Sequence, residues 1–297
     1  MLDFRMETFL TVCQTMHFTR AAELLHITQP AVSQHIRTLE QEYGAPLFLH
    51  EGKKLRLTEA GRLLWSAALT MRQDARLVKE QIGRLTGGQE SLTFGATLTV
   101  GDFAMPGPLA AYLRQYPEAR LQMQVADTKE LLGKIDRGEI DFAIVEGFFP
   151  QSEYDFLVYD TEQFIPVCGR DYAFRRRVRQ VEDLLEERLL VREEGSGTRH
   201  ILETYLEGRN LRIADFGRRA VIGSIAAIKS LTAAGCGVTF LYETAVRREL
   251  AEGSLREIPL DDFSIRHDFS FIWRKNSQFA HRYREIFSRL QQEEPEA

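Results

Sequence analysis

The chain contains 297 residues, a length that predicts two or three domains, and its 44% hydrophobic content is ordinary for a globular protein. The net charge of −5 argues against indiscriminate binding to nucleic acid, and residues 1–90 hold 11 Lys+Arg against 10 Asp+Glu, so they form no strongly basic patch. The three cysteines are too few and too widely spaced for a disulfide framework, and the lack of a signal peptide or a long apolar run predicts a cytoplasmic protein.

The first predicted helix spans residues 2–15. Its apolar stripe, formed by Met6, Phe9, Leu10 and Cys13, should close the core of an N-terminal helical domain. On this stripe Cys13 is better explained as a small core residue than as a redox sensor.

Residues 19–43 predict two short helices joined by a tight turn. Thr19 is the expected N-cap of the first helix and Thr28 that of the second. Pro30 is tolerated in the first turn of the second helix because the N–H groups there have no helical partner. Gly44 should end this helix. The spacing is that of a helix-turn-helix.

The second of these helices has two distinct faces. Val32, Ile36 and Leu39 recur at helical spacing and should face the core. The opposite face carries amides, hydroxyls and an arginine, which can pair with base edges and phosphates in the major groove of DNA. The residues expected to contact DNA from this helix are Thr28, Gln29, Pro30, Ser33, Gln34 and Arg37.

Two short apolar runs, residues 47–49 and 55–57, predict a two-stranded wing. The residues between them, 50–54, should form its basic tip, with Lys53 and Lys54 expected to contact DNA.

Thr58 should cap a long helix that reaches Leu85. Apolar residues recur along it at alternating spacings of 4 and 3, which is typical of a coiled-coil seam and predicts a dimer. The alternative is an amphipathic helix packed on its own domain. The seam consists of Leu64, Ala68, Met71, Ala75, Val78, Ile82 and Leu85.

Beyond a short break at residues 86–90, strands alternate with helices. This pattern indicates doubly wound α/β structure, with too many elements for one small sheet, so we expect two sheets and a cleft between them. Strands are predicted at 92–96, 120–125, 141–145, 164–167, 188–191, 219–221, 237–241 and 267–273, and helices at 103–116, 128–136, 198–207, 224–234 and 279–291.

Four loops in this half follow predicted strands and precede helices, where ligands bind in open α/β sheets. All carry Ser or Thr, and a loop rich in glycine and hydroxyls favours an anion near the helix N-terminus. Each loop taken alone could be an ordinary helix cap. The residues expected to bind a small molecule are Thr97, Leu98, Thr99, Thr128, Ser196, Gly197, Thr198 and Ser224.

An enzymatic role finds little support in the sequence. No nucleophile-elbow motif, His-Glu-x-x-His motif or cluster of metal ligands is present, so neither a cofactor nor a metal is expected. His200 is better explained as a solvated helix residue than as a base, and nothing near Cys168 or Cys236 marks a reactive thiol.

The N-terminal motifs resemble those of the LysR-type transcriptional regulators. The match is dense over about 60 residues, and looser motifs of the family's effector domain follow in the right order at 141–147 and 228–241. His50 departs from the family, which usually has arginine there, and this weakens the case for a phosphate contact at the base of the wing. The matching motifs are Ala21-Ala22, Gln29-Pro30-Ala31-Val32-Ser33, Leu39-Glu40, Gly44-Ala45-Pro46-Leu47-Phe48 and Leu57-Thr58-Glu59-Ala60-Gly61.

The resemblance implies a multidomain α+β protein. A winged helix-turn-helix domain (1–58) should precede a linker and dimerisation helix (59–88). The remainder (89–297) should be an effector domain resembling periplasmic solute-binding proteins, with two crossover strands joining lobe one (91–161 and 267–297) to lobe two (162–266).

The expected function is sequence-specific transcriptional regulation controlled by a small molecule between the lobes. The expected partners are double-stranded promoter DNA, an anionic effector, a second copy of the chain and, from the resemblance, a tetramer; RNA polymerase is a further candidate. The rival interpretation is a solute-binding protein or enzyme with an appended helical domain, in which Gln29, Ser33 and Gln34 would have no role.

Overall fold

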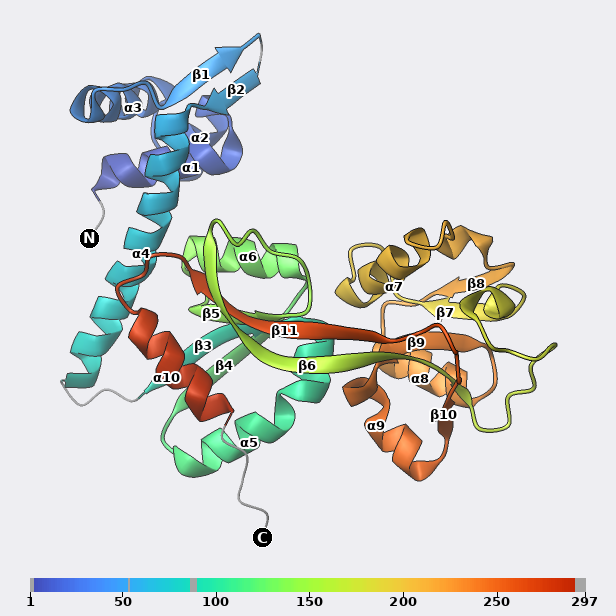
Figure 1. Cartoon of the computed structure of the whole chain (residues 1–297). Helices are drawn as coiled ribbons and strands as arrows, with labels where there is room; N and C mark the ends of the chain where they lie inside the picture. Colours follow the sequence, from blue (N-terminus) through green and yellow to red (C-terminus); the bar gives the residue numbers. More distant parts are fainter. Residues whose placement is uncertain (1–2, 53, 86–89, 292–297) are drawn as a thin grey trace.

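The computed structural model describes residues 3–52, 54–85 and 90–291. An N-terminal helical domain, a long helix and a two-lobed α/β domain follow one another along the chain (Figure 1). None of the helices in the described ranges combines the length and the apolar character that crossing a bilayer requires.

The N-terminal domain packs three helices against a small β-ribbon. Phe9, Val32 and Ile36 lie in its buried core, as the apolar spacing predicted. Ala21 and Ala22 are also buried, so α1 and α3 can approach the helix between them closely. The elements are α1 (Phe4–Thr15), α2 (Phe18–Leu25), α3 (Gln29–Tyr43), β1 (Phe48–Glu51) and β2 (Lys54–Leu57).

The helix caps of this domain agree with the sequence except at α2. Thr28 Oγ1 accepts a hydrogen bond from the backbone N–H of Ala31 at 3.3 Å, which confirms it as the cap of α3. The prediction that Thr19 caps α2 is wrong: the side chain of His17 is the cap. The helix begins earlier because the ring of Phe18 packs against Phe48 in the core.

The helix α4 (Glu59–Leu85) begins after Thr58, whose hydroxyl accepts from the backbone N–H of Gly61 at 2.9 Å. One face of α4 docks on lobe one. The amide of Gln73 is buried there and donates to the carbonyl of Ile140 at 3.3 Å and to the carboxylate of Asp141 at 3.2 Å.

The predicted seam lies on a different face of α4. The N-terminal part of the seam packs within the N-terminal domain, where Ala68 is buried. Toward the C-terminal end of the helix, the side chains are exposed: Met71 by 55%, Ile82 by 56% and Leu85 by 87%. The helix therefore packs on its own lobe through one face and leaves an apolar stripe uncovered on another.

The α/β domain carries helices on both faces of its strands (Figure 1). Its strands are β3 (Ser91–Ala96), β4 (Arg120–Val125), β5 (Phe142–Val145), β6 (Tyr154–Gly169), β7 (Arg188–Val191), β8 (Arg218–Val221), β9 (Val238–Tyr242), β10 (Leu255–Glu257) and β11 (Ile265–Arg274). Its helices are α5 (Pro106–Gln115), α6 (Thr128–Arg137), α7 (Gly197–Glu207), α8 (Ile225–Ala233), α9 (Glu243–Glu252) and α10 (Ala280–Leu290).

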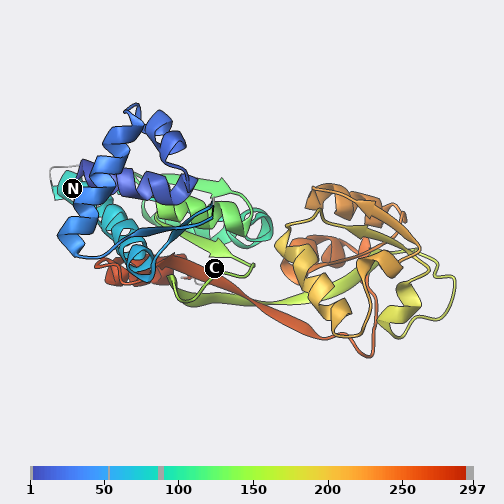
Figure 2. The same cartoon turned by 90° about the horizontal axis from the view of Figure 1, so that it is seen from above.

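Two long antiparallel strands, β6 and β11, run from one lobe into the other (Figure 2). They pair with β5 in lobe one and with β9 in lobe two. The described strands therefore form one hydrogen-bonded sheet in the order β4-β3-β5-β11-β6-β9-β7-β8, with β10 beside β6. The expectation of two separate sheets is wrong in this respect, because the crossover strands contribute to both halves.

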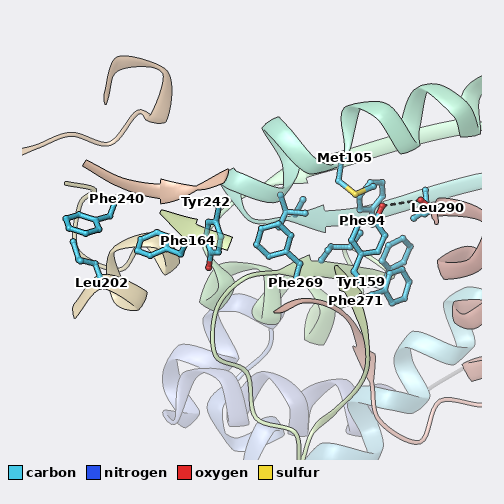
Figure 3. Close-up of a cluster of buried hydrophobic side chains, with 14 of the residues drawn as sticks. Phe94, Met105, Tyr159, Phe164, Leu202, Phe240, Tyr242, Phe269, Phe271 and Leu290 are labelled. Atoms are coloured by element: carbon cyan, nitrogen blue, oxygen red, sulfur yellow. Dashed lines mark hydrogen bonds between the residues drawn. The ribbon is translucent and has the colours of Figure 1, made fainter. Parts of the chain in front are cut away.

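An aromatic core follows the crossover strands through both lobes (Figure 3). In lobe one the ring of Phe142 stacks on Phe94 at 5.0 Å and on Phe271 at 4.3 Å between centroids. In lobe two Phe164 meets Tyr242 edge-on at 5.2 Å. Stacked and edge-to-face rings stabilise the core beyond the burial of their area.

Several elements differ from the sequence prediction. Strand β6 begins at Tyr154, ten residues before the predicted start at Phe164. The first helical segment of lobe one starts at residue 98 and includes a π-helical turn, Val100–Ala104, so the predicted start at Phe103 is wrong. Helix α9 and the short strand β10 were not predicted at all.

Candidate nucleic-acid interface and interlobe site

The outward face of α3 presents polar side chains to solvent. Gln34 and Arg37 are exposed, while Val32 and Ile36 beneath them are buried. Thr28, Gln29 and Pro30 are also exposed at the start of the helix, and Ser33 is half-buried. The helix thus offers its N-terminal end and one polar side together, as insertion into a major groove requires.

A shallow groove of about 350 Å³ separates α3 from the wing. Gln29 Nε2 donates to Ser33 Oγ at 3.0 Å along its wall, so the amide and the hydroxyl hold each other in position. His17 and His50 line the same groove from α2 and β1. His50 therefore faces the same space as the polar start of α3.

The wing is tighter than predicted. Glu51 and Lys54 are paired residues of β1 and β2, so the prediction that both belong to a five-residue tip is wrong. Gly52, at φ +63°, makes the turn possible because only glycine adopts this conformation without strain. Lys54 is exposed on the strand, whereas the predicted contact Lys53 lies outside the described residues.

Only some of the residues predicted to bind a small molecule lie where the two lobes meet. Thr99 Oγ1 of lobe one lies 3.2 Å from Thr198 Oγ1 of lobe two. Ser196 precedes α7 and is buried, yet its side chain makes no capping hydrogen bond. The Ser196 hydroxyl therefore does not serve as the cap of this helix.

The other predicted residues have mainly structural contacts. Thr97 Oγ1 accepts from the backbone N–H of Glu146 at 3.3 Å. Thr128 packs against Gly147, where an added Cβ would lie 2.3 Å from its hydroxyl oxygen. Leu98 packs against the hydrophobic cluster of lobe two. Ser224 is exposed and caps α8, accepting from the backbone N–H of Ala227 at 3.3 Å, so it fits the ordinary reading of a helix cap.

The sequence analysis did not single out Glu146, which lies at the centre of this junction. Its carboxyl group is buried, and Thr198 Oγ1 donates to Oε1 at 3.4 Å. A Cβ on Gly197 would lie 2.8 Å from its Cγ, so the start of α7 can approach it only through glycine. Burial raises the pKa of Glu146 to about 7, and the Thr99 hydroxyl, the charge of Arg192 and the Thr198 hydroxyl only partly oppose this rise.

Arg192 was also missed. It is buried, and its guanidinium bonds to Glu193 at 2.7 and 2.8 Å. Its positive charge also acts on Asp102 of lobe one, where burial raises the pKa and Arg192 partly lowers it. The signal was present in the sequence, since Glu146 and Arg192 each directly follow an apolar strand, at the end where α/β sheets bind ligands.

The cysteines show no sign of activation. Cys13 and Cys168 are buried, and burial raises the pKa of the Cys168 thiol to about 11. Cys236 is partly exposed and reduced. Across the described residues, no group of three or more His, Cys, Asp or Glu side chains is placed to hold a metal ion.

Two family models together match most of the chain. Residues 4–62 match the model of the bacterial regulatory helix-turn-helix protein, lysR family. Residues 86–294 match the LysR substrate binding domain.

Individual relatives match over similar lengths. A probable RuBisCO transcriptional regulator of Cyanidioschyzon merolae is 30% identical over 266 residues, which cover 87% of each protein. The HTH-type transcriptional regulator CysL of Bacillus subtilis is 28% identical over 271 residues, covering 90% of this chain and 89% of that protein. Among solved structures, full-length LysG of Corynebacterium glutamicum with bound effector Arg is 22% identical, has a TM-score of 0.64 and is matched over 98% of both chains.

Proposed function

The chain belongs to the LysR family of transcriptional regulators, and from this premise we propose which of its residues read DNA, pair two copies and bind the effector. The family couples a DNA-binding helix-turn-helix to an effector-binding domain. A regulator of this kind performs no chemistry on its effector, so we propose that the protein is not an enzyme.

The polar face of α3 is the proposed reading surface. Gln34 and Arg37 are exposed on it, and Gln29 and Ser33 stand in register one turn apart. Amides and hydroxyls pair with base edges, and an arginine pairs with guanine or phosphate. Lys54 on the wing would add a backbone contact. This exposed polar face above a buried apolar one is the observation that carries the proposal.

The lower half of α4 is the proposed dimer interface. Met71, Val78, Ile82 and Leu85 form an apolar stripe that remains exposed in the single chain. Burying such a stripe against a second copy is favourable at roughly 25 cal/mol per Å² of apolar area. Two recognition helices would also supply the affinity that a nearly neutral N-terminal domain lacks. A tetramer and a contact with RNA polymerase remain expectations from the family.

The effector would bind where Thr99, Ser196, Gly197 and Thr198 meet. The hydroxyls of these residues and the N-terminus of α7 suit a carboxylate-bearing molecule of modest size. LysG, whose structure carries arginine as bound effector, shows that this architecture holds small metabolites, but its low identity does not transfer the ligand.

A gel-shift titration tests the DNA-binding surface. With DNA from upstream of the protein's own gene, Ser33→Ala or Gln34→Ala should weaken specific binding by roughly 1–3 kcal/mol per lost base contact. Binding to random DNA should change little. Equal losses on both DNAs would mean that these residues touch only the backbone, and no specific binding by the wild type would favour the rival, a solute-binding protein or enzyme.

A further inference from the structure

Two buried polar atoms of opposite character lack hydrogen-bond partners at the lobe junction. Oε2 of Glu146 and Nη1 of Arg192 are both inaccessible and bond to nothing within the described residues. The side chains themselves are only 2% and 6% exposed. Buried polar groups are nearly always paired in folded proteins, so two orphans at one place call for a ligand.

The two side chains reach the same junction from different lobes. Glu146 directly follows β5 of lobe one, and Arg192 directly follows β7 of lobe two. Arg192 lines a small cavity together with Thr198, the residue that bonds to Glu146. Thr198 connects the lobes, since its hydroxyl lies 3.4 Å from Glu146 Oε1 and 3.2 Å from Thr99 Oγ1.

The chemistry of the two atoms favours a ligand that carries both charge types. A dicarboxylate would bring a second carboxyl group against Glu146. A simple amine would leave Nη1 of Arg192 without an acceptor, because Glu193 bonds only to Nε and Nη2. One molecule satisfies both atoms if it carries a hydrogen-bond donor with positive charge beside an acceptor with negative charge.

We infer that the effector is a zwitterion of the amino-acid class, whose protonated amine bonds to Glu146 and whose carboxylate bonds to Arg192 and the first turn of α7. This inference rests on the proposed function, because it assigns the ligand class of the same interlobe site. It also refines the expectation of an anionic effector, because the inferred effector carries a protonated amine in addition to the expected carboxylate. Ser196 supplies a further free hydroxyl beside the carboxylate.

The amine should dominate selectivity. A site with a buried carboxylate rejects an analogue that lacks the matching donor, because the carboxylate is then left unpaired. A charge-assisted hydrogen bond of this kind corresponds to about 10- to 100-fold in affinity. An amino acid should therefore bind at least about tenfold more tightly than the 2-hydroxy acid with the same side chain.

Thermal-shift measurements on the full-length protein with the twenty proteinogenic L-amino acids test the ligand class. Each amino acid that stabilises the protein is then compared by calorimetry with its 2-hydroxy acid, which lacks the amine, and its amide, which lacks the carboxylate. Both analogues should bind at least about tenfold more weakly. Stabilisation by none of the amino acids, or equal binding of the 2-hydroxy acid, overturns the inference.

Variants assign the effect to the site. Glu146→Gln should lower the affinity for the amino acid about tenfold or more while leaving that for the 2-hydroxy acid unchanged, so the preference disappears. Glu194→Gln, on the loop between β7 and α7 in lobe two and 89% exposed at its side chain, is the matched control and should keep the preference. An unchanged preference in Glu146→Gln refutes the assignment.

The gel shift separates this inference from the proposed function. If the wild type binds its upstream DNA specifically but prefers acids without an amine, only the ligand class is wrong. If specific DNA binding is absent while an amino acid binds, the regulator function fails and the ligand class stands.

Discussion

Replacing Glu146 with glutamine should change how the stability of the protein depends on pH. Folding buries this carboxyl and raises its pKa from the ordinary value of 4.5 to about 7. Well below pH 4.5, both folded and unfolded states hold the proton, so ionisation costs the fold nothing. As the pH rises toward 7, the unfolded state releases its proton first, and the free energy of unfolding falls.

The size of this effect follows from the two pKa values. A rise from 4.5 to about 7 corresponds to about 3 kcal/mol of stability that is lost between those pH values. Glutamine carries no charge at any pH and removes this loss. Tyr242 lies near Glu146, and burial raises its pKa well above 10.0, so it stays neutral over this range.

Urea unfolding at several pH values between 4.5 and 8, followed by tryptophan fluorescence, measures the difference. Trp273 is buried in lobe one and reports its unfolding. The stability of Glu146→Gln relative to the wild type should increase by about 3 kcal/mol across the range. Glu257→Gln, an exposed substitution on β10, should show no such increase. A constant difference for Glu146→Gln would mean that this carboxyl ionises as readily in the folded protein as in water.

Charge in the seam of α4 should weaken self-association: Met71→Asp combined with Val78→Asp should lower the mass observed by sedimentation at micromolar protein, and an unchanged mass would place the dimer contact elsewhere. By calorimetry, Thr99→Ala should weaken the effector about tenfold or more, while gel shifts without effector should match the wild type. Arg274→Ala should lower the free energy of unfolding by about 3–5 kcal/mol in urea titrations, because it empties the space of a fully buried side chain and removes the ion-pair partner of the half-buried Asp136; a loss below 1 kcal/mol would contradict this.

The N-terminal domain was largely predictable because its signals are local. A cap such as Thr28, a stop such as Gly44 and an apolar stripe at helical spacing each act within a few residues. The errors there are also local: His17, which accepts from the backbone N–H of Arg20, replaced Thr19 as the cap because either side chain can accept a hydrogen bond, and the packing of Phe18 favours the earlier start.

The effector domain was harder because its organisation depends on long-range pairing. The first half of β6, residues 154–163, mixes buried, half-exposed and exposed positions, and its apolar residues 156–159 were not recognised as part of a strand. Its partner β11 lies about a hundred residues later, and only their pairing joins both lobes into one sheet. The first strands were nevertheless found, because they form apolar runs bounded by Ser, Thr and Gly.

The missed site residues show the same limit. Glu146 and Arg192 looked like ordinary charged residues at strand ends, and composition favours the solvated reading for such residues. Only the fold reveals that each is buried at the junction and has an unpaired atom. The sequence does not show whether a charged residue at a strand end is buried. Burial is what distinguishes Glu146 and Arg192 from ordinary surface charges.

The way α4 is held restricts how an effector can influence DNA. Gln73 and Thr70 of α4 bond to the backbone of lobe one at Ile140 and Lys275, and pulling them apart would leave buried polar groups unpaired. Lobe two has no such bonds to α4 within the described residues; it connects to lobe one through β6, β11 and the junction around Thr198. Lobe one and the linker helix should therefore move together, with lobe two as the mobile partner. An effector that spans the junction then acts by favouring one position of lobe two, and it can shift DNA binding only as far as its affinity differs between positions.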